Sequence, residues 1–507
     1  MKQTDHYCLP LKTASDLPEL DFGKLTPIAT GDETSHAFQL LDTFDDTLSS
    51  AGKLLCDTGD TLELLTPRDG LLRQPATRSG PFVTDLADGP VKAALGDVSP
   101  LRALLPVGEG DMQEAMLSLV DGEQKTLVRI NLRLLTTQQG ESIAIVTLQG
   151  LRGYDKALAQ VREQILASGG APLGEGSIYA TLFPGHAGYV AKPVILIGQD
   201  EAAYHAANSI ICTYLPIARA NEKGIINDTD TEFLHDYRIA LRKIRSVLSL
   251  FSGVYSEKAT LRLKTRFSEL MSPTGRLRDL DVYLAEKDKF FALLPNTLHP
   301  GLAQLFDMFA DQRKEAQTAL SNHLKSKAYR QEVGDLVDLF AKGKKIKRGP
   351  DADRPALDYS RALIWKRYRK VCKIAAGIDA QTEDEEVHRL RIQCKKLRYL
   401  MEFFGPVFPK AEFQNILKPL KRLQDNLGLF NDYSVQQDNL RALLDDMGRT
   451  SEKKNLEIAQ SVGALVAVLH RKQLEERAKV MKSFANFNSK TTRDTFRTLF
   501  HDTKGKK

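Results

Sequence analysis

Two segments of the chain carry histidine, arginine and lysine at helical spacing. One is His235–Arg245, which reads HDYRIALRKIR, and the other is His388–Arg398, which reads HRLRIQCKKLR. Residues three or four apart share one face of a helix, so each segment forms a basic stripe. Because arginine and lysine bind phosphate oxygens and histidine titrates near neutral pH, these stripes offer anion binding. The members are His235, Arg238, Arg242 and Arg245 with Lys243 beside them (the first stripe), and His388, Arg391, Lys395 and Arg398 with Lys396 beside them (the second stripe).

Neither stripe contains an acidic residue that would relieve the repulsion between its charges. Like charges three or four residues apart destabilise a helix by roughly a few tenths of a kcal/mol per pair. A helix that only had to be soluble would mix the two signs along this face. We therefore expect an anion to neutralise each stripe. For each histidine, a hydrogen-bonded position at the boundary of the core is the alternative.

Further basic residues lie on predicted helices that follow each stripe. They either extend the stripes or form ordinary solvated surface. They are Arg262 and Lys264 after the first stripe, and Lys418, Lys421 and Arg422 after the second. Asp279 and Asp432 each follow a glycine by one turn, and we expect them to cap a helix or to orient an arginine such as Arg278.

The two stripes belong to a duplicated sequence. His235–Arg245 and His388–Arg398 share five of eleven residues and lie 153 residues apart. Gly275–Val282 and Gly428–Val435 are related at the same offset, which indicates a duplication. Beside each stripe runs an apolar face with steps of three and four, as expected for bundle helices. These faces comprise Leu234, Tyr237, Leu241, Ile244, Leu248 and Phe251, and Val387, Leu390, Cys394, Leu397, Met401 and Phe404.

The charge of the chain is divided unevenly along its length. Residues 1–200 contain 16 Lys and Arg against 26 Asp and Glu, whereas residues 201–507 contain 55 against 39. Either an anionic partner for the second part or a solvated helical surface explains this asymmetry.

The remaining composition is that of an ordinary globular protein, with 507 residues, 42% of them apolar and 27% charged. No apolar run approaches the length of a membrane span and the first residues lack a signal sequence, so we expect no membrane contact and a cytoplasmic location. The five cysteines are scattered without a CxxC pair, which argues against a disulfide framework or a zinc site. We expect neither a metal nor a cofactor.

The first part of the chain is predicted to be mixed and β-rich, and the second part helical. The β-branched segments 126–135 and 142–148 predict a hairpin, and a helix is expected at 153–168. From about residue 200 to 485, proline and glycine are sparse and the pattern is helical. The fold class is therefore α+β and multidomain. The expected domains are 1–195 and 200–485, and a basic loop at 343–355 divides the second into repeats at about 200–342 and 356–485.

The pattern H-x-x-R-I-x-x-[RK]-K-[IL]-R, followed by G-x-x-[RN]-D, resembles the CHAD domain, the conserved histidine α-helical domain. The resemblance covers about residues 200–485 and includes both repeats. It implies two four-helix bundles related by pseudo-twofold symmetry, with basic surfaces flanking a central groove. It also implies binding of inorganic polyphosphate and association with polyphosphate granules. The two stripes and the basic residues that follow them are then the expected polyphosphate-binding residues.

CHAD domains often follow a CYTH domain, the triphosphate-tunnel fold, and residues 1–195 resemble one in two places. Leu41–Leu55 is similar to that family's YDT…L…AG…L segment, and Leu151–Asp155 is similar to a segment near its end. The family's opening ExExK motif falls on Cys8–Lys12, where only the lysine matches.

Other family positions also differ from the CYTH pattern. The family's later arginines fall on Cys56 and Thr58 and its late carboxylates near Thr147 and Gln149, although Arg129 and Arg133 match in kind. Hard divalent cations need carboxylate ligands, so phosphoryl hydrolysis would lack its metal. The resemblance therefore implies a degenerate CYTH-like domain without triphosphatase activity.

Three functions are compatible with these features. The first is polyphosphate binding by the helical part, and the alternative is a metal-dependent triphosphatase or polyphosphatase acting through the CYTH-like domain. The third is nucleic-acid binding by the same stripes. Against the third, the aromatic residues lie on or near core faces and do not alternate with the stripes as stacking platforms for bases would. These residues are Tyr237, Phe251, Tyr399 and Phe404.

Overall fold

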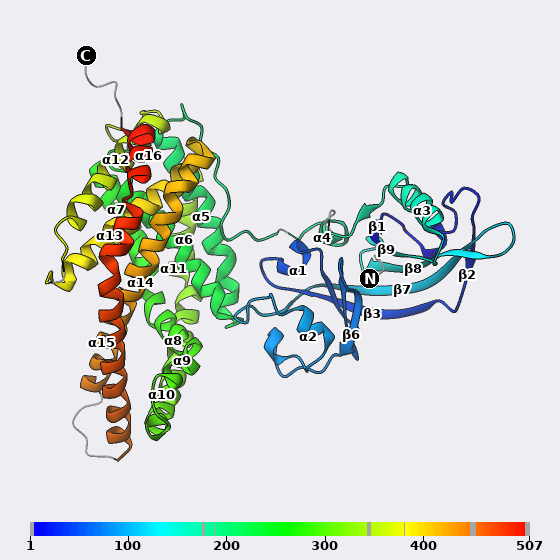
Figure 1. Ribbon diagram of the computed structural model, residues 1–507, viewed down its shortest axis with the longest axis horizontal. Coiled ribbons are helices and arrows are strands. Elements are labelled where there is room, and N and C mark those ends of the chain that lie inside the picture. The colour runs from blue at the N-terminus through cyan, green and yellow to red at the C-terminus, as the bar shows by residue number, and fades with distance from the viewer. Residues whose placement is uncertain are drawn as a thin grey trace. The chain divides into compact units, whose positions relative to one another are not determined.

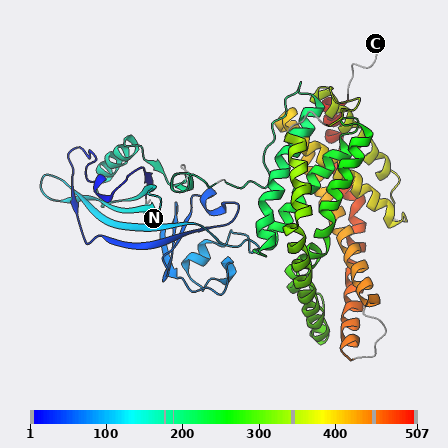
Figure 2. The same cartoon turned by 180° about the vertical axis from the view of Figure 1, so that it is seen from behind.

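The computed structural model describes residues 5–174, 178–186, 188–341, 346–379, 381–446 and 453–501. The chain divides into two compact units, Met1–Ala191 and Lys192–Lys507. Figures 1 and 2 show the first as a β-rich body and the second as a helical one. The first part of the basic loop expected at 343–355 falls outside the described residues, which resume at residue 346.

The first unit is built on one antiparallel sheet of ten strands, ordered β10-β1-β9-β8-β7-β3-β4-β5-β6, with β2 paired to β7. The strands are β1 (Asp5–Leu9), β2 (Thr26–Ala29), β3 (Thr34–Asp42), β4 (Leu54–Asp57), β5 (Thr61–Thr66), β6 (Gly70–Pro75), β7 (Leu105–Val120), β8 (Thr126–Thr137), β9 (Ser142–Gly150) and β10 (Ala171–Pro172). The helices are α1 (Thr47–Ser50), α2 (Pro90–Ala94), α3 (Asp155–Ala167) and α4 (Ile178–Leu182).

The predicted hairpin and the helix after it are confirmed. Strands β8 and β9 pair antiparallel from Val128 opposite Gly150 to Thr136 opposite Ser142. Alternate residues of a strand face opposite sides of a sheet. Leu132 on β8 accordingly packs in a core with α3, whereas Leu135 packs on the other face with α4.

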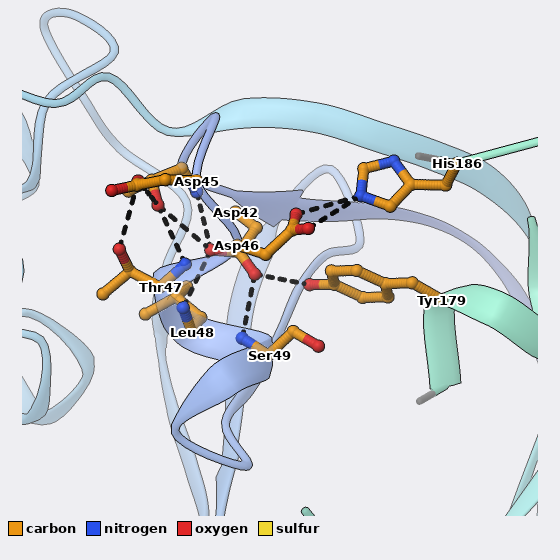
Figure 3. A network of polar contacts seen from close by, with 9 residues as sticks. Asp42, Asp45, Asp46, Thr47, Leu48, Ser49, Tyr179 and His186 are labelled. Atoms are coloured by element: carbon orange, nitrogen blue, oxygen red, sulfur yellow. Dashed lines mark hydrogen bonds and ion pairs between the residues drawn. The ribbon is translucent and has the colours of Figure 1, made fainter. Parts of the chain in front are cut away.

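The segment Leu41–Leu55 joins β3 to β4 through α1, and one buried carboxylate organises it (Figure 3). Asp42 accepts hydrogen bonds from the backbone nitrogens of Leu48 and Ser49, both at 2.9 Å, and from the Tyr179 hydroxyl at 3.0 Å. Burial raises the pKa of Asp42, although these donors act in the opposite direction. Nearby, His186 contacts Asp46 at 2.9 Å. This network joins α1 to α4, so its role is structural.

The second unit is helical throughout the residues that the structure describes. Its first half contains α5 (Ala203–Ile226), α6 (Thr231–Leu250), α7 (Glu257–Met271), the 3-10 helix η3 (Ser272–Thr274), α8 (Gly275–Ala285), α9 (Lys287–Ala292), α10 (His299–Lys325) and α11 (Lys327–Ala341). Its second half contains α12 (Ala356–Ala375), α13 (Asp384–Phe404), the 3-10 helix η5 (Gly405–Val407), α14 (Lys410–Asp446), α15 (Lys453–Phe487) and α16 (Lys490–Phe500). The long helices α14 and α15 run side by side in both views.

Helices of the two halves correspond at the offset of 153 residues that relates the two stripes. Thus α5 and α12 begin at Ala203 and Ala356, and α6 and α13 begin at Thr231 and Asp384. One difference has a local cause. Pro273 lacks a backbone N–H and interrupts the helix between α7 and α8, whereas α14 continues through the equivalent Asn426.

Pairs of equivalent residues contact each other where the halves meet. Phe251 stacks on Phe404 with ring centroids 4.8 Å apart, and Ala202 forms an antiparallel bridge with Pro355. Each pair is separated by the same 153 residues. Contact between a residue and its own equivalent is characteristic of packing about a twofold axis.

The apolar faces predicted beside the two stripes are buried, as expected. Every residue of both faces is at most 3% exposed, from Leu234 to Phe251 on the first and from Val387 to Phe404 on the second. Burying one face of each helix fixes the rotation of the helix, so the basic stripe is held at the edge of the core. Among the described residues, no helix is both long and apolar enough to cross a membrane.

Candidate functional site

The two stripes lie on helices whose first turns are stabilised by acidic residues. The carboxylate of Asp230 caps α6 and accepts hydrogen bonds from the backbone nitrogens of Glu232 at 2.9 Å and Phe233 at 3.2 Å. Helix α13 begins with the acidic run Asp384–Glu386, whose negative charges interact favourably with the positive end of the helix dipole. The leading histidine of each stripe is the fifth residue of its helix, so the stripes occupy equivalent positions.

A groove of about 1180 Å³ lies beside α13, with α6 and α14 contributing to its walls. Both stripes reach it, the first through Arg242 and the second through Arg391, Lys395 and Arg398. Eight cationic side chains line the groove against two carboxylates, which belong to Glu402 and Asp425. This excess of positive charge gives the groove a positive potential. The eight cations are Lys192, Arg242, Lys243, Arg391, Lys395, Arg398, Lys410 and Lys421.

Glu402 neutralises two of the eight cations. Its carboxylate lies 2.5 Å from Lys243 Nζ and 2.8 Å from Arg398 Nε. Burial alone would raise the pKa of Glu402, but Lys243 and Arg398 together hold this pKa below its usual value. Glu402 is therefore ionised. It lies four residues after Arg398, one helical step beyond the second stripe, and was not among the predicted site residues.

Tyr399 lies among the groove cations. The Nζ atoms of Lys243 and Lys395 lie 4.8 Å and 5.9 Å from the centre of its ring. Ammonium groups near an aromatic ring interact favourably with its π electrons. The expectation that the aromatic residues stay apart from the stripes is therefore wrong for Tyr399.

Lys395 is surrounded by other cations. Burial lowers its pKa most, and the charges of Arg242, Arg391 and Arg398 lower it further, to about 8. Asp432 acts in the opposite direction but lies nearer Arg391, at 3.8 Å from its guanidinium. Among the residues that the structure describes, no carboxylate lies within ion-pair distance of Lys395 Nζ.

The first stripe continues away from the groove through Arg238. Its guanidinium donates a hydrogen bond to Thr274 Oγ1 at 2.5 Å, and the charges of Asp279, Arg245 and Arg278 act on it. Asp279 and Asp432 are equivalent residues of the two halves. The charge of Arg238 acts on Asp279, and Asp432 lies 3.8 Å from the guanidinium of Arg391, so each aspartate lies near the equivalent arginine of its own stripe.

Lys396 belongs to a second group of cations outside the groove. Burial lowers its pKa first, and the charges of Arg367, Lys370 and Lys264 lower it further. Lys264 comes from α7 and the two other neighbours from α12. Arg367 and Lys370 were not predicted as site residues, because only the packing of α12 against α13 brings them beside the second stripe.

Only some of the predicted binding residues line the groove. Six line it, namely Arg242, Lys243, Arg391, Lys395, Arg398 and Lys421. Nine do not contribute to its lining, namely His235, Arg238, Arg245, Arg262, Lys264, His388, Lys396, Lys418 and Arg422. His388 is exposed and His235 is half-buried, at the boundary of the core. The sequence missed Lys192 and Lys410, which lie outside the repeated motifs.

The first unit contains a cavity of about 860 Å³ in which the charges are largely compensated. Arg133 contacts Glu114 at 2.7 Å and Glu63 at 3.3 Å, and Arg73 contacts Glu63 at 2.5 Å. Lys12, the matching residue of the opening motif, lies beyond β1 and is exposed. Within the described ranges, no group of three or more His, Cys, Asp and Glu side chains is arranged to hold a metal ion.

Comparisons with known proteins found relatives of part of this chain. Two uncharacterized proteins of Mycobacterium tuberculosis, from strains CDC 1551 and H37Rv, are each 24% identical over 313 residues, which cover 59% of this chain. The alignment spans 56% of each relative, so this chain matches about half of their length.

Two solved structures also resemble the chain. The CHAD domain from the plant Ricinus communis has 23% identity and a TM-score of 0.49, covering 60% of this chain and 98% of that one. PptA from Streptomyces chartreusis has 13% identity and a TM-score of 0.44, covering 56% of this chain and 99% of that one. The family model of the CHAD domain matches residues 210–441, which span both stripes. The helical unit therefore contains a CHAD domain.

Proposed function

We propose that this protein binds inorganic polyphosphate in the groove of its CHAD domain. The observation that carries the proposal is the charge of the groove, where eight cations face two carboxylates. Glu402 offsets two of these cations, while Lys395 has no ion-pair partner among the described residues. A chain of phosphates supplies closely spaced negative charges that match such a lining.

The geometry favours polyphosphate over nucleic acid. Tyr399 lines the groove, and two lysine ammonium groups already lie near its ring. The other aromatic residues of the lining are buried. A nucleic-acid groove instead offers several free ring faces on which successive bases stack. We further propose that this binding attaches the protein to polyphosphate granules in the cytoplasm.

Competition tests the identity of the ligand. Labelled long-chain polyphosphate is bound to the full-length protein and displaced with unlabelled polyphosphate or with single-stranded RNA of equal charge. We expect polyphosphate to displace the label at far lower concentration. Equal displacement by both polymers would contradict the proposal, since any polyanion would then suffice.

Paired substitutions test the location of the site. Arg242→Gln with Arg391→Gln removes one cation of the groove from each stripe. The matched control, Arg262→Gln with Arg422→Gln, removes the same charge from exposed positions outside the groove. Since each lost arginine–phosphate contact is worth about 1.5–3 kcal/mol, we expect the first pair to weaken binding at least tenfold more than the control. Equal losses would place binding elsewhere on the surface.

We propose that the first unit does not hydrolyse the polymer. The support is that Glu63 and Glu114, the acidic residues nearest Arg133, are paired with arginines and thus poorly placed to hold a cation. Incubation with tripolyphosphate and Mg²⁺ or Mn²⁺ tests this. Phosphate release that disappears on changing Arg133→Gln would overturn the proposal.

A further inference from the structure

Lys395 lies among cationic side chains in the groove. It faces Arg242 from α6, Arg391 and Arg398 from its own helix, Asp432 from α14 and the ring of Tyr399. Lys243, which also lines the groove, has its pKa lowered by burial too, but the carboxylate of Glu402 at 2.5 Å acts in the opposite direction. Lys395 is thus the groove lysine whose charge is opposed by its neighbours.

The duplication makes this position chemically asymmetric. The residue of the first stripe that is equivalent to Lys395 is Arg242, and the two lie close enough for their charges to interact. A guanidinium stays protonated and is not nucleophilic at physiological pH, whereas a lysine in a cationic environment yields a free amine. One side of the groove therefore binds anions permanently, and the other carries a group that can react.

We infer that Lys395 is a site of acylation by small acyl phosphates, which the neighbouring arginines bind through the phosphate group. The arginines recognise the phosphate, and this places the acyl carbon beside the amine. Such a compound is both an anion suited to the groove and an activated acyl donor. The inference does not rest on polyphosphate binding, because it needs only the cationic cluster and one uncharged amine.

The reaction with acetyl phosphate balances without any further reactant. The lone pair of Lys395 Nζ attacks the carbonyl carbon, and a C–N bond forms. The bond between the acyl carbon and the oxygen that bridges to phosphorus breaks, and inorganic phosphate leaves with that electron pair. The nitrogen loses one proton, which the departing phosphate takes up. The products are Nε-acetyllysine and hydrogen phosphate.

Two features of Lys395 favour this reaction over reaction at other lysines. With a pKa of about 8, roughly half of its amine is uncharged at pH 8, against less than about one in a hundred for an ordinary lysine. The arginines also raise the local concentration of the phosphate donor. Acetylation then removes one of the eight groove cations, which weakens the attraction of the groove for any polyanion.

Peptide mass spectrometry tests the inference on the full-length protein. The protein is incubated with acetyl phosphate at pH 8, and the initial rate of acetylation is measured at every lysine. Digestion at acidic residues and fragment ions separate Lys395 from Lys396. We expect Lys395 to react at least tenfold faster than the exposed Lys418 on α14 and than the paired Lys243. We also expect the rate to saturate with acetyl phosphate and inorganic phosphate to inhibit it.

Acetic anhydride, which carries no phosphate, separates amine reactivity from phosphate docking. Preference for Lys395 with both reagents, but saturation only with acetyl phosphate, supports the inference. Preference with the anhydride alone would overturn it, as would equal rates at Lys395 and Lys418 with acetyl phosphate.

Arg242→Gln provides a second check from α6, outside the modified helix. It should slow acetylation of Lys395 severalfold and leave Lys418 unchanged, while circular dichroism shows that the fold is intact. An unchanged rate at Lys395 would show that the arginine cluster does not direct the reaction. None of these readouts uses polyphosphate, so failure of polyphosphate binding and failure of this inference are distinguishable.

Discussion

Raising the pH from 7 to 9 should weaken polyphosphate binding about tenfold through Lys395 alone. The pKa of Lys395 is lowered to about 8 by burial and by Arg242, Arg391 and Arg398. Bound phosphates counter these charges and return the pKa towards the ordinary lysine value of about 10.4. At pH 7 about nine-tenths of Lys395 is charged before binding, but at pH 9 only about one-tenth, so binding at pH 9 must take up about 0.9 proton. Since the complex needs the charged form of Lys395, the affinity falls in proportion to its charged fraction, from about nine-tenths at pH 7 to about one-tenth at pH 9.

The stability of the free protein should change in the opposite direction. Folding lowers the pKa of Lys395 from 10.5 to about 8, so between these values the unfolded chain binds more protons than the folded one. Stability therefore rises with pH through this window, by at most about 3 kcal/mol before any allowance for solvent screening. The weaker binding at pH 9 is thus not explained by partial unfolding from this group.

Isothermal titration calorimetry at constant ionic strength measures the affinity at pH 7, 8 and 9. At pH 9, buffers of different ionisation enthalpy give the number of protons taken up. Burial raises the pKa of Tyr399, so this neighbour stays uncharged in the range. Lys395→Arg keeps its charge at every pH and should make the affinity nearly constant. A fall as steep in that variant, or a change of less than twofold in the original protein, would refute the reasoning.

Three further changes probe the groove, the contact between the helical halves and the first unit. Glu402→Gln removes the carboxylate that pairs with Lys243 and Arg398. It should therefore lower the unfolding free energy by about 1–2 kcal/mol but raise the affinity for polyphosphate severalfold. An unchanged affinity in titration calorimetry would contradict this expectation. Phe251→Ala should cost about 3–5 kcal/mol in urea unfolding, since this buried ring stacks at the contact between the halves. Asp42→Ala should lower the unfolding free energy of the first unit, measured by thermal melting, by about 2–4 kcal/mol, because the hydrogen-bond donors lose their acceptor. A loss below about 0.5 kcal/mol, the size expected of an ordinary surface substitution, would show that the network is dispensable.

The parts of the fold that follow from local pattern could be predicted from the sequence. The apolar steps from Leu234 to Phe251 and from Val387 to Phe404 identified both buried faces, because the period of the helix alone determines which residues share a side. The hairpin of β8 and β9 followed in the same way from two β-branched segments and a short turn between them.

The composition of the groove could not be predicted, because it depends on contacts between the two halves. Lys243 meets Glu402, which lies 159 residues further along the chain. No helical period relates these residues, and only the packing of α6 against α13 brings them together. The stripes also contain no acidic residue in the sequence, whereas Asp279, Asp432 and Glu402 each approach one of their arginines from the same half of the fold.

The contact between equivalent residues also bears on the kind of polymer that suits the groove. Phe251 meets Phe404, and Arg242 lies near its counterpart Lys395, so the two halves face each other across an approximate dyad. Only one such pair, Arg242 and Lys395, is found among the eight groove cations that the structure describes, so the lining presents different charges to the two ends of a strand. Nucleic acids have a 5′ and a 3′ direction and would fit one entry better than the other. A linear chain of phosphates reads the same both ways, so each encounter can be productive without first reversing the strand.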